Sequence, residues 1–383
     1  MKIVDLKCII LSAPTGGLDW IGGRLETWDS AFVKIETDEG VYGLGEVTQS
    51  ATGAGAVQGI LDVLKPSLIG VDPRRPKEVY QVAYNTSLFW ARGGIAGGVI
   101  SAVENASWDV AGKAAGLPVC RLLGGPVFDS LPVYASVGLG KCVDDVVASV
   151  RKNQDDGFQF IKVRALQNPA ATLEMLEAVE AMLKPGVRIM LDAVQSLTYT
   201  PWTFKDALEV GRRLGRMNAV FYEEPLRAED IDGYVELRRR LDVPIAGAET
   251  FHSPYEFQKM IDAGGIDIAQ PDATIVGGIG ALHAVATMCQ YKHVATIPHT
   301  WGAAGSVQAN HHAAFSHPNI RMVEFSTYHN PLLDALLIDT PYPVKNGRIQ
   351  APTAPGLGIQ ISEELIARFG GYRPGEGIRT TRD

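Results

Sequence analysis

Cysteine is scarce in this chain of 383 residues. The four cysteines, Cys8, Cys120, Cys142 and Cys289, lie far apart and form no CxxC pair. A disulfide framework or a cysteine-rich zinc site needs cysteines at closer, paired spacings, so neither is expected. The pattern fits reduced thiols and predicts a cytoplasmic protein.

Long apolar runs are also missing. No stretch reaches the roughly 18 apolar residues that a membrane-spanning helix needs. The N-terminal apolar stretch is interrupted by Asp5 and Lys7 and lacks a cleavage-site pattern. It therefore predicts a first β-strand and not a signal peptide, and no membrane partner is expected.

Positive charge is in the minority, with 35 Lys and Arg against 43 Asp and Glu and a net charge of −8. A nucleic-acid partner would require a basic face, so none is expected. A GxGxxG motif after the first strand is absent too, which disfavours an open dinucleotide-binding sheet. The length allows two domains, or one large barrel with an addition.

Residues 1–126 predict an α+β domain. Three antiparallel strands and two helices are expected there, at residues 3–11, 31–37, 41–47, 57–68 and 100–113. The glycine-rich segment 15–24 lies between the first two strands, and its composition predicts a mobile loop.

Residues 127–330 show a regular alternation of strand and helix patterns. Eight short apolar runs are candidate strands, at residues 133–137, 160–164, 188–192, 220–223, 245–249, 266–272, 294–299 and 322–325. Because each is reached by a crossover, they predict an α/β fold with a (β/α)8-type (TIM-like) barrel, whose strands all end at one mouth. No ordinary helix follows the eighth strand, and residues 331–383 are expected to pack back on the N-terminal domain.

Three successive strands of this barrel end in a carboxylate. Asp192, Glu223 and Glu249 are separated by 31 and 26 residues, and one strand plus one crossover helix needs roughly 30. Parallel neighbouring strands would bring the three acids together. Converging carboxylates repel one another unless a cation lies between them, and all-oxygen ligands suit Mg²⁺. The three acids therefore predict a magnesium site.

The second strand carries two basic residues. Side chains alternate along a strand, so Lys162 and Arg164 should both point into the barrel near its mouth. The alternative, two basic residues on a solvated edge, is disfavoured because a central parallel strand is buried on both faces. Glu324 ends the eighth strand, within reach of the same mouth.

Asp272 and His299 end the sixth and seventh strands and lie 27 residues apart, again one strand–helix unit. A carboxylate beside an imidazole fixes its tautomer and raises its basicity, which makes His299 a candidate general base. A lone histidine is more often structural, but the position beside the three acids favours the catalytic interpretation.

Together these motifs resemble the enolase superfamily, and within it the mandelate racemase and muconate lactonizing enzyme family with its acid-sugar dehydratases. The resemblance covers essentially the whole chain and depends on the order and spacing of Ser107 to Lys113, Lys162-Val163-Arg164, Asp192, Glu223-Glu224-Pro225, Glu249, Gln270-Pro271-Asp272 with Gly277-Gly278, and Pro298-His299. It implies a modified (β/α)7β barrel with an N-terminal capping domain over its mouth.

The resemblance also implies the chemistry. A substrate carboxylate binds Mg²⁺ held by the three acids, a base removes the proton α to that carboxylate, and the metal stabilises the enediolate. By the same resemblance, His299 supported by Asp272 is the acid/base. Lys162 helps to bind the carboxylate, and Glu324 hydrogen-bonds it or the enediolate.

One position departs from the family pattern. The usual second-strand motif is Lys-x-Lys, whose second lysine is a base on the opposite face of the substrate, and Arg164 stands there instead. Arginine holds its proton too firmly to be an easy base, so its role becomes electrostatic. The leading hypothesis is therefore a one-base dehydration of an acid sugar to a 2-keto-3-deoxy acid. A cycloisomerase, a racemase or epimerase, and a non-catalytic sugar-acid sensor stay open as alternatives.

Contacts to the rest of the substrate are expected from the capping domain and from two barrel loops. The candidates are Trp20, Arg24, Gln49, His252 and Trp301. Arg24 hints at a second substrate carboxylate. Because relatives are commonly dimers to octamers, the resemblance also implies a homo-oligomer.

Overall fold

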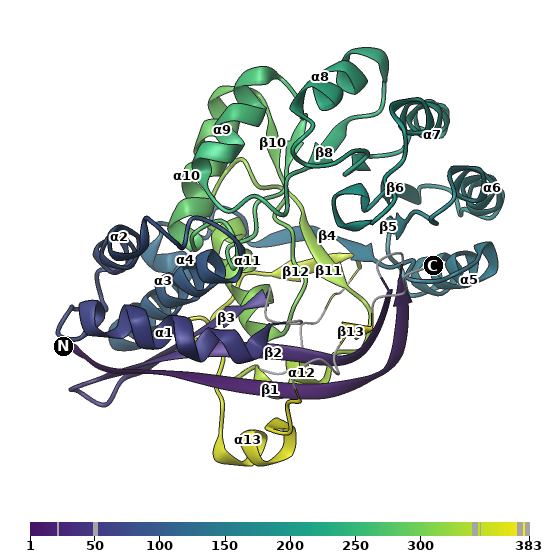
Figure 1. The fold of residues 1–383 in the computed structure, drawn as a ribbon. Coiled ribbons are helices and arrows are strands. Elements are labelled where there is room, and N and C mark those ends of the chain that lie inside the picture. Colours follow the sequence, from purple (N-terminus) through teal and green to yellow (C-terminus); the bar gives the residue numbers. More distant parts are fainter. Residues whose placement is uncertain (21–22, 49–52, 339–343, 345, 374–377, 380–383) are drawn as a thin grey trace.

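The computed structural model describes residues 1–20, 23–48, 53–338, 344, 346–373 and 378–379 (Figure 1). The chain begins with a long antiparallel hairpin of β1 (Ile3–Trp20) and β2 (Gly23–Thr37), and β3 (Tyr42–Val47) also pairs with β2. The mobile loop expected at residues 15–24 is contradicted in the described part of that segment, because residues up to Trp20 belong to β1 and residues from Gly23 belong to β2. A register shift between Pro14 and Leu18 accommodates the two glycines without ending the pairing.

Helices cover this sheet and complete the capping domain. They are α1 (Ala54–Leu68), α2 (Pro76–Ser87), α3 (Gly94–Ala115) and the short α4 (Val119–Leu122). The buried residues of α1 recur at helical spacing, so one apolar stripe faces the core. Helix α3 lies unusually close to β3, because a Cβ atom at Gly43 or Gly45 would overlap a backbone carbonyl of α3.

The second body is a barrel of parallel strands. Its strands in the described part of the chain are β4 (Ser130–Ser136), β5 (Phe160–Arg164), β6 (Arg188–Asp192), β7 (Tyr222–Glu223), β8 (Ile245–Gly247), β9 (Ile268–Ala269), β10 (Ala295–Thr296) and β11 (Val323–Ser326). They pair in the order β10-β9-β8-β7-β6-β5-β4-β11, and a parallel bridge between Thr296 and Ile320 joins the two ends. The predicted modified TIM-type barrel is confirmed.

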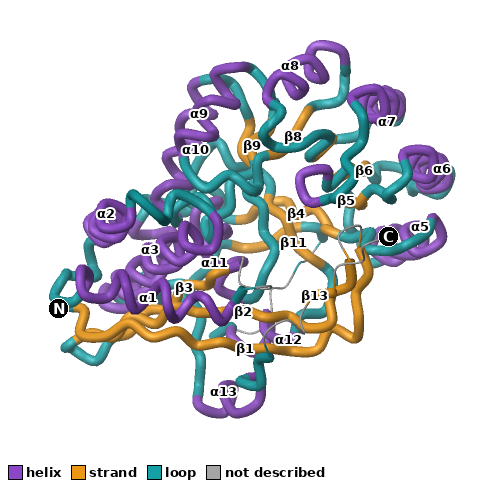
Figure 2. Tube along the Cα trace, in the orientation of Figure 1, coloured by secondary structure: helices purple, strands orange, loops and turns teal. Residues whose placement is uncertain are grey.

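Helices alternate with the strands around the outside of the barrel (Figure 2). They are α5 (Val143–Asp155), α6 (Pro169–Glu180), α7 (Phe204–Arg216), α8 (Ile231–Arg240), α9 (Pro254–Ala263), α10 (Ile279–Tyr291) and α11 (Ala304–Phe315). A separate apolar cluster fills the barrel interior, with Tyr134, Met190 and Phe221 all fully buried. The barrel interior is therefore packed with side chains and is not an open channel. The polar side chains at the strand ends lie above this packed layer.

After β11 the chain runs through the short α12 (Pro331–Leu336) and then touches both bodies. Strand β12 (Arg348–Gln350) pairs antiparallel with β4, α13 (Glu363–Phe369) contacts β1, and β13 (Ile378–Arg379) pairs with β2. The division at residues 126 and 330 stays a prediction. Among the described helices, none is both long and apolar enough to span a membrane.

Candidate active site

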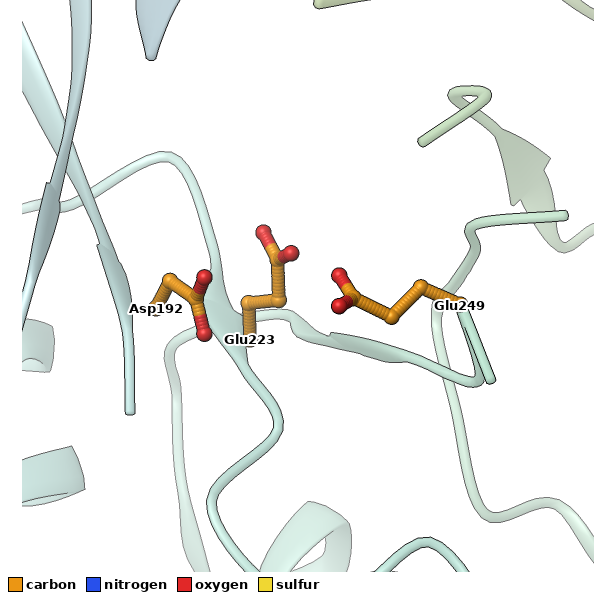
Figure 3. A group of neighbouring side chains, drawn as sticks. All are labelled: Asp192, Glu223 and Glu249. Atoms are coloured by element: carbon orange, nitrogen blue, oxygen red, sulfur yellow. The ribbon is translucent and has the colours of Figure 1, made fainter. Parts of the chain in front are cut away.

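The three predicted metal ligands meet at the mouth of the barrel. Asp192 and Glu223 end the neighbouring strands β6 and β7 and are paired in register, and Glu249 follows β8 by two residues. The positive φ of 76° at Ala248 turns the chain there. One carboxylate oxygen from each residue lies within 4.8 Å of the others, and all three side chains are buried (Figure 3). The three acids converge as expected from their spacing, and their role as metal ligands stays a prediction.

The electrostatics of the three acids fit a divalent cation. Burial raises the pKa of Glu223 well above its ordinary value, and repulsion from Asp192 and Glu249 adds to the effect of burial. Burial also raises the pKa of Asp192, with Glu249 again opposing the charged form. Buried carboxylates that repel one another are stabilised by a shared cation, and three oxygen ligands suit a hard one.

Lys162 lies directly beneath the three acids and is completely buried. Its Nζ lies 2.9 and 3.0 Å from the two carboxylate oxygens of Glu223 and 2.9 Å from Oε1 of Glu324. Burial alone would lower the pKa of Lys162, but Glu223 and Glu324 raise it well above the ordinary value. Lys162 is therefore a permanently charged anchor for two carboxylates.

Arg164 forms part of the cavity wall and is also held in place. Its guanidinium donates hydrogen bonds to the carbonyl oxygen of Val137 (3.0 Å) and to the hydroxyl of Ser136 (3.2 Å), and its Nε lies 3.7 Å from Oδ2 of Asp192. The guanidinium also lies over the ring of Trp301, 4.8 Å from its centroid. Burial lowers the pKa of Arg164, yet Asp192 outweighs it and the pKa is raised, so the side chain is a fixed cation.

His299 and Asp272 form the predicted pair. The His299 Nδ1 lies 2.8 Å from Oδ2 of Asp272, and the other oxygen of Asp272 accepts hydrogen bonds from the backbone N–H of Thr274 (2.7 Å) and from Nδ2 of Asn310 (3.0 Å). These donors make Oδ2 an acceptor for the Nδ1 proton, which leaves Nε2 free to exchange a proton on the side of Glu249, 3.7 Å away.

The charge state of His299 follows from the same neighbours. Burial lowers its pKa, but Glu249 and the hydrogen bond to Asp272 outweigh burial and raise the pKa to about 10. A divalent cation bound at Glu249 would cancel much of that attraction. The pKa of His299 would then fall toward the range in which a general base works near neutral pH.

Glu324 on β11 is fully buried, with a hydrogen bond at one carboxylate oxygen and an ion pair at the other. Its Oε2 accepts a hydrogen bond from the backbone N–H of Thr300 (2.9 Å), while Oε1 faces Lys162. Burial raises the pKa of Glu324, but Lys162 and His299 outweigh burial and bring the pKa down to about 2. The carboxylate thus fixes the segment that follows His299. Its predicted hydrogen bond to substrate stays a prediction.

A cavity of about 280 Å³ lies between the barrel mouth and the capping domain. From the barrel it is lined by polar and charged side chains together with aromatic and aliphatic ones: Arg164, Asp192, Glu249, Thr250 and His299, with Trp301, Leu139, Val194, Leu197 and Ile275. From the capping domain it is lined by Leu25, Thr27, Trp28, Asp29, Ser30, Glu46 and Thr48. The sequence did not single out Trp28, Asp29 or Glu46. The sequence feature that could have indicated the two acids is the presence of a carboxylate within an otherwise apolar strand pattern.

Of the residues with described side chains that are predicted to contact the substrate, one lines the cavity and two do not. Trp301 lines the cavity and packs against Trp28 with ring centroids 5.4 Å apart. Arg24 instead pairs within its own hairpin, with Asp19 at 2.8 Å and Glu26 at 3.2 Å, and His252 packs near the backbone of Gly93 and Gly97. Neither Arg24 nor His252 is among the described residues that line the cavity.

Two further predicted contacts are not described. Gln49 lies outside the described residues, and so does the side chain of Trp20. All five of these substrate contacts stay predictions.

Two buried acids of the capping domain bind the loops that carry the site. Glu46 accepts hydrogen bonds from the backbone N–H groups of Ala303 and Ser306, both at 2.8 Å, at the start of α11. Glu104 accepts bonds from Ile279 (2.9 Å) and Gly280 (3.1 Å) at the start of α10. Each carboxylate satisfies N–H groups that have no partner inside their helix, and so fixes the capping domain over the barrel mouth.

Comparison with known proteins agrees with this architecture. The chain is 30% identical over 358 residues to D-galactarolactone cycloisomerase from Agrobacterium fabrum, covering 90% of this chain and 92% of that one. It is 32% identical over 346 residues to D-galactonate dehydratase from Verminephrobacter eiseniae, covering 88% and 89%. The crystal structure of 3,6-anhydro-D-galactonate cycloisomerase from Zobellia galactanivorans superposes with a TM-score of 0.86 at 28% identity, covering 96% and 99%.

Two family descriptions match along the chain. Residues 23–124 match the mandelate racemase/muconate lactonizing enzyme N-terminal domain. Residues 145–365 match the enolase C-terminal domain-like family. The chain therefore belongs to the mandelate racemase/muconate lactonizing enzyme family of the enolase superfamily.

Proposed function

We propose that the protein is a Mg²⁺-dependent dehydratase that converts an acid sugar to a 2-keto-3-deoxy acid. The observation that carries the proposal is the asymmetry of the mouth. His299 has its Nδ1 hydrogen-bonded to Asp272 and its Nε2 on the cavity side, whereas the strand that supplies a second base in relatives presents only ion-paired cations, Lys162 and Arg164.

The chain's own residues account for both proton transfers. His299 Nε2 takes the proton from C2 of the substrate, next to the carboxylate. The C3–O bond then breaks, and the hydroxyl leaves as water with the proton that the imidazolium returns. The enol that remains takes up a proton at C3 and releases the proton on its C2 oxygen to give the 2-keto-3-deoxy acid, so one water is lost overall.

The charges around the mouth support this reaction. A divalent cation held by Asp192, Glu223 and Glu249 would take up the negative charge that develops on the substrate carboxylate. Arg164 is a fixed cation on the cavity wall and can bind the same carboxylate. Lys162 keeps Glu223 oriented from below, and the capping domain covers the mouth and limits access of water.

A cycloisomerase is the second candidate, because it begins with the same proton abstraction. Two of the relatives described above are named cycloisomerases, so the likeness of this chain to them favours that possibility specifically. In a cycloisomerase the C–O bond that breaks at the β-carbon would be part of a ring and would not belong to a free hydroxyl group. No water would then be lost.

An assay in D₂O tests the proposal. The protein with Mg²⁺ is incubated with a panel of acid sugars and their lactones, and the products are followed by NMR and by a colour test for 2-keto-3-deoxy acids. Formation of the keto acid from a free acid sugar supports dehydration. Loss of a lactone without release of water supports cycloisomerisation instead. Deuterium exchange at C2 with neither product supports racemisation, and no reaction across the panel contradicts all three.

A further inference from the structure

The two ends of the mouth cavity differ in charge. At the barrel end Arg164 lines the wall next to the three acids, with Lys162 buried below. At the capping-domain end the wall contains two buried carboxylates, Asp29 and Glu46, together with hydroxyl groups. A substrate that spans the cavity must therefore present different chemistry at its two ends.

Glu46 is 1% exposed and is held by three donors. Its Oε1 accepts hydrogen bonds from the backbone N–H of Ala303 (2.8 Å) and from the hydroxyl of Ser30 (2.9 Å), and its Oε2 accepts one from Ser306 (2.8 Å). A carboxylate has about four acceptor positions, so one has no donor among these contacts, and Glu46 lines the cavity. That position suits a donor from the substrate.

Asp29 and the nearby hydroxyl groups extend the same wall. Asp29 is 6% exposed and accepts one hydrogen bond from Ser12 at 2.6 Å, which leaves further acceptor capacity. The hydroxyls of Thr48, which lines the cavity, and of Thr274 lie 2.7 Å apart, and the Thr274 hydroxyl donates to Oδ1 of Asp272. Hydroxyls and carboxylates side by side are the groups that bind a polyhydroxylated chain.

At this end of the cavity, the described lining residues include no cation that could bind a second carboxylate. Among the described residues that line the cavity, Arg164 is the one Lys or Arg, and it belongs to the barrel end. Arg24 is already paired with Asp19 and Glu26.

We propose that the substrate is an acid sugar with one carboxylate, an aldonate or its lactone, whose neutral hydroxyl-bearing end contacts Asp29 and Glu46. This inference depends on the proposed function and makes it narrower, because it disfavours sugar diacids. A sugar hydroxyl can donate to either acid, whereas a second substrate carboxylate would face acids of like charge, with no Lys or Arg among the described residues that line this end. The second carboxylate suggested by Arg24 in the sequence is therefore not expected.

A matched pair of substrates tests this inference. Galactonate and galactarate share their configuration from C2 to C5 and differ only in the group at C6, which is CH₂OH in one and a carboxylate in the other. With Mg²⁺ present, kcat/KM should be at least about tenfold higher for galactonate, mainly through KM. Equal or better use of galactarate would overturn the inference while leaving the proposed function intact.

Binding provides a readout that does not need turnover. Calorimetric titration of the His299→Asn protein with each acid should give the tighter affinity for galactonate by a similar factor. If neither acid is turned over by the unmodified protein, the proposed function has failed for this pair. The affinity ratio still decides the inference, because it measures the charge preference of the cavity alone.

Variants connect the preference to the two acids. Asp29→Asn should narrow the ratio of galactonate to galactarate kcat/KM by several-fold, because it removes one negative charge from the wall. Glu46→Gln should narrow that ratio less, because burial raises the pKa of Glu46 and favours its neutral form. Glu46→Gln also disturbs the start of α11, so Asp29→Asn, with a single side-chain partner, is the cleaner variant. Glu78→Gln on the exposed surface of α2 serves as the control and should leave the ratio unchanged. An unchanged ratio in Asp29→Asn would contradict the assignment.

Discussion

The barrel mouth and the capping domain both bury carboxylates, but they stabilise them differently. In the capping domain each buried acid is separate and is surrounded by N–H donors. Glu104 accepts from Trp108, Ile279 and Gly280, and Asp109 accepts from Leu44, Leu357 and Lys113.

At the mouth, Asp192, Glu223 and Glu249 are clustered, and Lys162 is the main donor beneath them. A buried carboxylate with enough donors joins two parts of a fold. A cluster with too few donors is stabilised by a bound cation, and so marks a functional site.

The largest expected effect is on the mouth side of this comparison. His299→Asn should reduce kcat by about 10⁴-fold, the upper part of the range for general acid–base catalysis, because one group performs both proton transfers. Asparagine can still donate to Asp272, so the fold should be unaffected. Titration with Mg²⁺ should show affinity within a few-fold of the unmodified protein. Retained full activity would remove His299 from the mechanism.

The dependence of the acids at the barrel mouth on a nearby cation predicts a second large effect, on the free energy of unfolding. Lys162→Met leaves Glu223 and Glu324 buried without their shared cation, and we expect a loss of about 3–5 kcal/mol in the free energy of unfolding when EDTA is present. Saturating Mg²⁺ should restore part of the loss, because the metal replaces the missing charge at Glu223. Urea denaturation with and without Mg²⁺ measures both quantities.

A matched control for that variant lies on α5. Lys152 pairs with Asp156 at 2.7 Å, but both side chains are exposed, and Lys152→Met should change the free energy of unfolding by less than about 1 kcal/mol. If the two variants lose similar stability, or if Mg²⁺ has no effect on Lys162→Met, the three acids are not stabilised in the way described here.

The same contrast explains what could be predicted from the sequence. Asp192, Glu223 and Glu249 follow strands that recur at the period of one strand–helix unit, so their convergence is a consequence of chain spacing alone. His299 and Asp272 follow the same rule. The (β/α) alternation therefore predicted both the barrel and its mouth.

The capping domain's contribution depends on docking and could not be predicted in that way. Glu46 and Glu104 act on helices that begin more than 170 residues later in the chain. No local pattern specifies which helix start an acid will meet. The contacts of Arg24 show the same limit, because its side chain pairs with Asp19 and Glu26 inside its own hairpin, and the sequence pattern did not specify those partners.

The smallest expected effect is on the capping-domain side, at Glu104. Burial raises the pKa of this carboxyl from 4.5 to about 8, against the N–H donors that favour its charged form. Below pH 4.5 both the folded and the unfolded states hold the proton. As the pH rises toward 8 only the unfolded state releases it, so stability should fall across that interval and level off above it.

Glu104→Gln cannot ionise and isolates this effect. The stability of the unmodified protein relative to the variant should decrease between pH 4.5 and 8, by roughly 1–3 kcal/mol in urea denaturation. This change in the free energy of unfolding is smaller than that expected for Lys162→Met. The contact between Glu104 on α3 and the start of α10 can open locally and admit water, which reduces the cost of the charge. A relative stability that rises with pH would mean that the N–H donors outweigh burial, and that the separate acids of the capping domain are fully stabilised as anions.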